Sequence, residues 1–420
     1  MIQKTVLSNG IRVVTEVVPN VHSVSIGIWI KTGSRHEKDG ENGIAHFIEH
    51  MLFKGTEKHT AFDIAKVIDS VGGILNAFTT KEYTCYYVKV LTQHLSLGID
   101  ILWDIFFHSL FQSEEIEKER NVILQEINMV KDTPDDYIQD LFNQSFYSGH
   151  SLGNAILGEL ETVERFGRQD MVDFFAREYL DPGRIIISAA GNIEHDFLAD
   201  QVLRIFEIPA KAGEAAHKDS FRATRQVSFH YRELEQVHMC LGTVGASQVD
   251  PERYGYYLIS SILGGSMSSR LFQEIRENRG LAYSVYSFLA AFYDTGMFGV
   301  YMGVRRESLK EALHIVLAEF RRLQEEAIAE SDLTNAKEQI KGNMLLGLES
   351  SDSRMSRLAK CEIYYDEYIP VEELIRNIDA VTPEAVREIA RRIFRDELFT
   401  YTFLGPVNKK EIQDNFLAMG

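Results

Sequence analysis

Two histidines and a glutamate lie close together in an apolar stretch of this 420-residue chain. His46 and His50 are four positions apart, and Glu49 directly precedes the second histidine. On an α-helix, residues four apart lie above one another on one face, so both imidazoles could bind the same metal ion. The order H-x-x-E-H reverses the zinc-binding motif H-E-x-x-H. The segment therefore predicts a zinc site in which Glu49 lies beside the position left for a water molecule.

A helix could also carry two histidines for packing or capping alone. The neighbours of Glu49 include Phe47, Ile48 and Met51, which are all apolar. A carboxylate among such residues is costly unless it is paired or functional. This cost favours the metal-binding interpretation over simple packing.

A hydrolytic zinc site usually has three protein ligands, so a third ligand must come from elsewhere in the chain. Residues 114–131 have the apolar spacing of a helix, with Ser113 placed as its N-cap. Glu119 and Glu126 are seven positions apart and fall close to the apolar face of this helix. Both are candidate ligands. The alternative is an ordinary charged surface helix, which suits Glu119 better than Glu126, whose immediate neighbours are mostly apolar.

Composition and cysteine usage restrict the class of protein. The chain has 44 basic and 62 acidic residues and a net charge of −18, which argues against binding to nucleic acid. This charge would suit a basic substrate but does not establish one. Cys85, Cys240 and Cys361 are far apart and form no C-x-x-C pair. We expect free thiols in a reducing compartment, with neither a disulfide framework nor a thiolate zinc site.

The sequence predicts neither a membrane segment nor a signal peptide. No apolar run approaches the roughly 18 residues needed to cross a bilayer. The chain goes directly into a hairpin pattern around Asn9-Gly10, without the parts of a signal peptide. We therefore expect a protein that is cytoplasmic, or already processed, and that does not bind membranes.

The two halves of the chain resemble each other. Residues 24–34 match residues 237–247, and residues 181–191 match residues 396–405 at almost the same offset. Each segment of the first pair is a strand pattern that runs into a glycine-containing turn. Two matches at nearly one offset indicate an internal duplication of one α+β unit.

This duplication predicts the domain organisation. Residues 1–210 would form the zinc-binding catalytic domain and residues 224–420 a duplicated supporting domain. Residues 211–223 are small and polar without periodicity, which is typical of a linker. In each half, strands come early and long helices follow, so we predict an α+β fold in which each domain is a mixed β-sheet with helices packed on one face.

The duplication also tests the metal site. At the repeat offset, His46 and His50 correspond to Ile259 and Leu263. The second copy keeps the helix and lacks the ligands, so packing alone does not require histidines there. One catalytic half and one supporting half is the better interpretation.

With these residues, the chain resembles the pitrilysin/insulinase family of inverted-motif zinc peptidases. It is most similar to the branch that contains the β subunit of mitochondrial processing peptidase and its bacterial homologues. In that family, a ligand glutamate follows the second histidine by 76 positions, which is Glu126 here, and a second glutamate precedes it by seven, which is Glu119. The resemblance covers nearly the whole chain. It implies Zn²⁺ held by His46, His50 and Glu126, with Glu49 as the base and Glu119 orienting a ligand histidine.

The resemblance also implies residues that bind the substrate. Residues 72–79 are similar to a family segment, G-x-x-N-A-x-T, that forms a sheet edge beside the metal. An exposed edge can bind an extended peptide as an added strand. This assigns substrate binding to Asn76, Ala77, Phe78 and Thr79. The glycines before them could also cap a helix, which does not exclude this role.

In the second half, Arg276 and Tyr283 resemble a family arginine and tyrosine that are also seven positions apart. There, the two residues contact the substrate backbone and the reaction intermediate. Without the resemblance, Arg276 and Arg279 would be interpreted as surface residues.

Longer family members enclose the substrate with four such units in one chain, like a clamshell, and this chain has two. The resemblance therefore implies a zinc metalloendopeptidase that forms a homodimer around a chamber and cleaves short or unfolded peptides. One alternative is a catalytically silent partner or scaffold subunit of a processing-peptidase-like complex. Another is a zinc-stabilised binding module closed by a fourth ligand, for which His59 and His94 are candidates, although surface positions suit them better.

Overall fold

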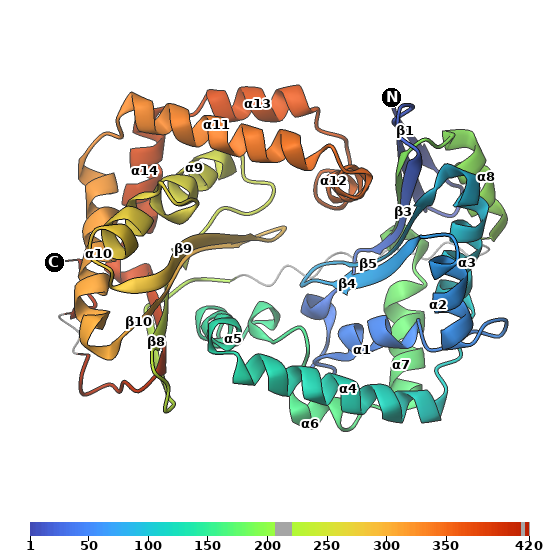
Figure 1. Cartoon of the computed structure of the whole chain (residues 1–420), viewed down its shortest axis with the longest axis horizontal. Helices are drawn as coiled ribbons and strands as arrows, with labels where there is room; N and C mark the ends of the chain where they lie inside the picture. The colour runs from blue at the N-terminus through green and yellow to red at the C-terminus, as the bar shows by residue number, and fades with distance from the viewer. Residues whose placement is uncertain (206–220, 413–415, 420) are drawn as a thin grey trace. The chain divides into compact units, whose positions relative to one another are not determined.

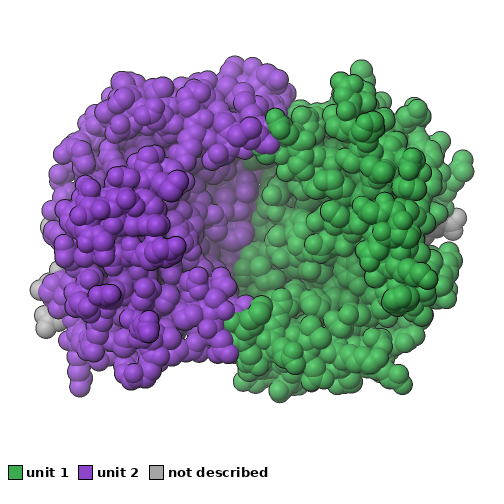
Figure 2. Space-filling model, viewed as in Figure 1, with its two compact units in different colours: residues 1–129, 154–217, 347–368 green, residues 130–153, 218–346, 369–420 purple. Residues whose placement is uncertain are grey.

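The computed structural model describes residues 1–205, 221–412 and 416–419. It divides into two compact units, which Figure 2 shows in different colours. Each unit combines three segments of the chain: Met1–Met129, Asn154–His217 and Gly347–Tyr368 in unit 1, and Val130–Gly153, Lys218–Leu346 and Ile369–Gly420 in unit 2.

Unit 1 contains a six-stranded sheet in the order β1-β2-β6-β3-β5-β4 (Figure 1). Strands β2 and β6 are parallel, and the other neighbouring strands are antiparallel, so the sheet is mixed. Strand β4 lies at one edge of this sheet. The strand bounds are β1 Ile2–Val6, β2 Arg12–Val17, β3 Ser23–Ile30, β4 Ile74–Thr79, β5 Thr84–Leu91 and β6 Ile185–Gly191.

One face of this sheet is covered by helices that follow the early strands in the sequence. Alternate residues of β3, such as Ile26 and Ile28, join the same buried cluster as Phe47, Leu102 and Ile123 of these helices. The main helices of unit 1 on this side are α1 Ile44–Met51, α2 Ala61–Asp69, α3 Leu95–Phe107, α4 Ser113–Asp132 (whose last turn belongs to unit 2), α7 Arg168–Phe174 and α8 His195–Ile205.

Unit 2 contains a five-stranded sheet in the order β7-β11-β8-β10-β9. Here β7 and β11 are parallel, so the second sheet repeats the arrangement of the first without a counterpart of β1. Its strands are β7 Gln226–Tyr231, β8 Val237–Val244, β9 Ala282–Ala291, β10 Gly296–Val304 and β11 Thr400–Gly405. Its larger helices are α9 Arg253–Gly264, α10 Leu309–Glu325, α11 Glu330–Gly347, α13 Val371–Asp379 and α14 Pro383–Ile393.

Each sheet also has a helix on its opposite face, and that helix comes from the other half of the chain. Helix α12 (Ser351–Tyr364) packs on β2, β3 and β6 of the first sheet, where Met355 and Leu358 join Trp29 in a buried cluster. Helix α5 (Pro134–Phe146) packs on β7, β8 and β11 of the second sheet, where Phe142 is fully buried. Each half of the chain thus contributes one helix to the sheet of the other half.

A glycine in each sheet allows the exchanged helix to approach closely. A Cβ atom on Gly242 of β8 would lie 2.4 Å from Cζ of Phe142. A Cβ atom on Gly27 of β3 would lie 3.2 Å from Sδ of Met355. Both distances are shorter than ordinary contacts, so any larger residue would displace the helix or its side chain.

The predicted α+β fold with two mixed sheets is confirmed. The prediction placed helices on one face of each sheet, and the exchanged helices on the opposite faces were not foreseen. The domain bounds 1–210 and 224–420 stay a prediction, because the exchange divides the compact units differently, and the predicted linker 211–223 lies mostly outside the described residues.

Two further expectations concern the thiols and membranes. The three cysteines are buried, and no disulfide joins any two of them. Within the described ranges, no helix has both the length and the apolar composition needed to span a membrane.

Candidate metal centre

Helix α1 positions the two histidines and the adjacent glutamate. Its apolar residues are buried in the core of unit 1, and the helix begins after Gly43, whose φ of 95° favours glycine. The carboxylate of Glu37 accepts hydrogen bonds from the amides of Gly43 and Ala45, both at 3.0 Å. These bonds satisfy amides that the first turn of a helix leaves unpaired, and they fix where α1 starts.

The structure brings His46, His50 and Glu126 together. The Nε2 atoms of both histidines lie 3.8 Å from Oε2 of Glu126, which projects from α4. Within the described part of the chain, this is the one group of three or more His, Cys, Asp or Glu residues whose ligand atoms all lie within 4.8 Å of one another. The predicted third ligand thus comes from the predicted helix.

The three side chains fit zinc. A separation of 3.8 Å is too long for a hydrogen bond. Zinc bonds to nitrogen and oxygen are about 2.0–2.2 Å long, so one ion can join atoms up to about 4.2 Å apart. Burial, together with the neighbouring His50, lowers the pKa of His46 to about 3. His46 is therefore a neutral imidazole at neutral pH, which is the form that binds a metal ion.

Glu119 fixes the orientation of His50. Its Oε2 atom lies 3.1 Å from Nδ1 of His50, and its Oε1 atom forms an ion pair with Lys54 at 2.6 Å. A proton on Nδ1 donates to this carboxylate and leaves the lone pair of Nε2 directed at the metal position. His46 has no equivalent contact among the described residues, since its Nδ1 atom is buried without a hydrogen-bond partner.

Glu49 lies next to these ligands and is held by the edge strand. Its Oε2 atom accepts a hydrogen bond of 2.5 Å from Oγ1 of Thr79. Burial raises the pKa of Glu49, although the interaction with Thr79 opposes that rise. A raised pKa brings a carboxyl group closer to the range in which it can take up and return a proton.

Strand β4 leaves one edge open beside α1. Among the described residues it pairs only with β5, and it contacts α1 on one face. Ala77 packs into the core with α1, whereas the ring of Phe78 lies 5.5 Å from Trp29 in the cluster with α12. Asn76 Oδ1 accepts a hydrogen bond from the amide of Ala77 at 2.9 Å. The side chain of Phe78 thus faces away from the metal-binding helix.

Arg276 and Tyr283 lie close together in unit 2. Arg276 belongs to the π-helix Phe272–Glu277, and its guanidinium carbon lies 4.7 Å from the ring centroids of both Phe272 and Tyr283. Tyr283, on β9, is 78% exposed, so its hydroxyl can reach a ligand. The candidate ligands His46, His50 and Glu126, in contrast, all belong to unit 1.

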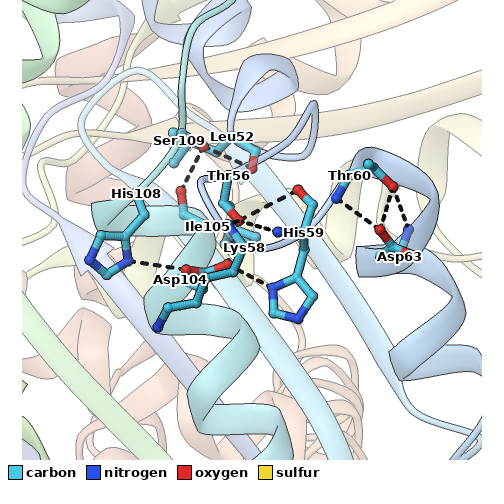
Figure 3. A network of polar contacts seen from close by, with 10 residues as sticks. All are labelled: Leu52, Thr56, Lys58, His59, Thr60, Asp63, Asp104, Ile105, His108 and Ser109. Carbon is cyan, nitrogen blue, oxygen red and sulfur yellow. Dashed lines mark hydrogen bonds and ion pairs between the residues drawn. The ribbon is translucent and has the colours of Figure 1, made fainter.

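His59, a possible fourth ligand, has a different partner. Figure 3 shows Asp104 of α3 between His59 and His108. The Nδ1 atoms of the two histidines lie 2.9 and 3.1 Å from its carboxylate oxygens, and Thr56 donates to the same carboxylate at 2.5 Å. This network fastens the segment after α1 to α3. His94 contacts its neighbour Gln93 at 3.1 Å and does not join the metal group either.

Two contacts of the site were not foreseen from the sequence. Thr79 was assigned to the substrate-binding edge, but its bond to Glu49 was not predicted. Lys54 was missed, although its position four residues after His50, near acidic candidates, could have suggested it.

Comparisons with known proteins agree with the geometry. The family model for insulinase (peptidase family M16) matches residues 12–160, and the model for the peptidase M16 inactive domain matches residues 165–340. An uncharacterized zinc protease of Bacillus subtilis, YmxG, is 42% identical over 94% of this chain and 97% of its own length. An uncharacterized zinc protease of Streptomyces coelicolor is 40% identical over 98% of this chain and 91% of its own length.

Solved structures share the fold at lower identity. A protease from Helicobacter pylori superposes with a TM-score of 0.89 at 20% identity, covering 96% of this chain and 99% of that one. A chain of complex III2 from Candida albicans, with Inz-5 bound, superposes with a TM-score of 0.86 at 22% identity and 99% coverage of both chains.

The family models span most of the sequence, and relatives named zinc proteases match it almost from end to end. The chain therefore belongs to the insulinase family of zinc proteases, peptidase family M16, as the resemblance in its sequence indicated.

Proposed function

We propose that this chain is a zinc metalloendopeptidase that hydrolyses peptide bonds in short or unfolded peptides. The observation that carries this proposal is the convergence of His46, His50 and Glu126 on one point, with the carboxylate of Glu49 beside them. Two nitrogens and one oxygen leave a zinc ion one position for water, as hydrolytic sites require.

Glu49 and Glu119 have different roles in the proposed hydrolysis. Bound at this site, zinc would supply a water of lowered pKa and a positive charge beside the scissile carbonyl. Glu49 takes the proton of the attacking water and returns it to the leaving amine. Glu119 keeps the imidazole of His50 in the orientation that the metal needs, because it accepts the proton on Nδ1.

The open edge of β4 suits an extended peptide. Its unpaired amides and carbonyls can pair with a peptide added as a further strand. Asn76, Ala77, Phe78 and Thr79 would bind this peptide mainly through their backbone. Phe78 can contribute only its backbone, because its ring packs against Trp29.

The assembly proposed for this enzyme is a homodimer that encloses a chamber. Arg276 and Tyr283 of one chain would reach the metal site of the partner chain, where both can donate hydrogen bonds to a substrate carbonyl or a developing oxyanion. The exposure of Tyr283 and the stacking of Arg276 on its ring support this role. We place the enzyme in the cytoplasm, where the three cysteine thiols would stay reduced.

Mixing two inactive variants tests this assembly. A Glu49→Gln chain lacks the base, and a Tyr283→Phe chain lacks the oxyanion donor. If each site uses Tyr283 of the partner, a mixed dimer has one complete site and regains activity. No recovery on mixing would show that both residues act within one chain.

The decisive experiment is digestion of a peptide library by the zinc-loaded protein, with and without a chelator. We expect cleavage that the chelator stops and added zinc restores. Glu49→Gln is the matched control and should keep one zinc per chain without cleaving. Full cleavage by this variant would refute the role of Glu49, and no cleavage by the zinc-loaded wild type would favour the silent-subunit alternative.

A further inference from the structure

We propose that Thr79 is the positioning residue of the general base: its hydroxyl holds Glu49, while its backbone amide faces the edge at which an incoming peptide strand would pair. This inference rests on the proposed function, because it concerns how the base is held in the same site. Thr79 thereby joins the substrate-binding edge of β4 to the base.

One short hydrogen bond joins these residues. The hydroxyl of Thr79 donates to Oε2 of Glu49 at 2.5 Å. Hydrogen bonds to an ionised carboxylate are shorter and stronger than bonds between neutral groups. This bond fixes the place of the carboxylate.

The register of the hairpin shows that the amide of Thr79 points to the open edge. Thr80 donates to the carbonyl of Tyr83 at 2.9 Å, so this pair is a hydrogen-bonded pair. In an antiparallel ladder, bonded and non-bonded pairs alternate. Thr79 opposite Thr84 is therefore a non-bonded pair, and so is Ala77 opposite Tyr86. The amides of Thr79 and Ala77 both face away from β5.

These two amides are the groups with which an added peptide strand would pair. The amide of Ala77 also donates to Oδ1 of Asn76 at 2.9 Å, so a peptide carbonyl would displace this side chain. A peptide carbonyl that pairs with the amide of Thr79 leaves the hydroxyl bond to Glu49 in place. The same residue would thus bind the substrate backbone and hold the base.

Kinetics of Thr79 variants test the positioning role. In Thr79→Val, kcat should fall about 10- to 100-fold, the equivalent of one lost hydrogen bond to a charged group, with zinc content and KM unchanged. Thr79→Ser keeps the hydroxyl and should restore kcat. The matched control is Thr92→Val, which removes a hydroxyl that donates to the carbonyl of His22 at 3.1 Å. A rise in KM with unchanged kcat in Thr79→Val would overturn the proposal.

Hydrogen exchange gives a readout that does not depend on turnover. In zinc-loaded Glu49→Gln, a bound peptide should slow exchange of the amide of Thr79, because this amide faces the open edge. Equal exchange with and without the peptide would show that the amide does not pair with a substrate and overturn the proposal. If the peptide protects the amide but the wild type cleaves no peptide, the proposed function fails, and the positioning of a base fails with it although the pairing stands.

Discussion

Glu119 connects α4 to the end of the metal-binding helix through His50 and Lys54. Its side chain is almost fully buried, so the ion pair with Lys54 compensates the cost of burying its charge. The carboxylate of Glu119 is therefore held where it can accept the hydrogen bond from Nδ1 of His50. Residues of this kind affect metal affinity without touching the metal.

We expect Glu119→Gln to lower zinc affinity about 10- to 100-fold, because an amide orients His50 less firmly than a carboxylate does. Competition with a chromogenic chelator measures this change. Glu114→Gln, an exposed position on the same helix, is the control and should leave the affinity unchanged. Equal affinity of Glu119→Gln and the wild type would contradict this role.

His36 makes the free energy of unfolding depend on pH. His36 accepts a hydrogen bond from the amide of Gly33 through Nδ1 at 3.2 Å, which requires an unprotonated ring. Burial, assisted by Arg184, lowers the pKa of His36 to about 4. An unfolded chain protonates this histidine near pH 6.5. Its contribution to stability is therefore complete above about pH 6.5 and is lost as the pH falls towards about 4.

His36→Gln should remove this part of the pH dependence. Glutamine can still accept from the amide of Gly33, but it does not titrate. Between about pH 6.5 and pH 4, the wild type should lose about 2–3 kcal/mol more in free energy of unfolding than the variant does. Urea unfolding at a series of pH values measures the difference, and parallel curves for the two proteins would contradict the assignment.

At the scale of single residues, the sequence predicted those parts of the site whose residue types and spacing are required by metal binding. Two histidines four apart on a helix and a glutamate on a second helix could be found, because metal binding needs those residue types. The bond between Thr79 and Glu49 could not be found, because it joins residues from different elements whose distance the sequence does not reveal.

Among the elements, α5 and α12 are the ones whose place could not be predicted. The apolar spacing of a helix shows which face is buried, but not which sheet buries it. The duplication suggested that each half would cover its own sheet. The helices instead cross to the sheet of the other half, and the chain then returns to its own unit, since α7 and α8 follow α5 and α13 and α14 follow α12.

The glycine beneath α5 provides a test of this packing. In Gly242→Ala, the new methyl group would lie 2.4 Å from the ring of Phe142 and 2.7 Å from the carbonyl oxygen of Phe298. We expect a loss of about 1–3 kcal/mol in the free energy of unfolding, the usual cost of overpacking. Urea unfolding at constant pH measures this loss.

Gly342→Ala is the matched control for that substitution. Gly342 lies in α11, and a Cβ atom there would have no other atom within 4 Å. Alanine should therefore stabilise the protein by about 0.5–1 kcal/mol through helix propensity. A stable Gly242→Ala protein would mean that α5 does not pack closely on β8.

For the whole molecule, the exchange predicts how the chain behaves when it is cut. Residues 1–205 carry the first sheet and α5, and residues 221–420 carry the second sheet and α12. Each piece alone leaves one face of its sheet uncovered and holds the helix that the other piece lacks. We expect the two pieces to associate on mixing and to recover zinc binding, measured by size-exclusion chromatography and metal content.

A charge in the exchanged helix serves as the control for this experiment. Leu358 of α12 is buried against the first sheet, so Leu358→Glu in the second piece should weaken the association. Two pieces that fold separately and stay monomeric on mixing would contradict the prediction.

The reciprocal exchange also bears on the ancestry of such a chain. A single ancestral copy would have covered its sheet only by swapping a helix with a twin molecule, as swapped dimers do. Fusion of two such copies into one chain would make that encounter permanent and independent of concentration. One copy could then do without the histidines, whose places at the repeat offset are taken by Ile259 and Leu263, while both sheets stay covered.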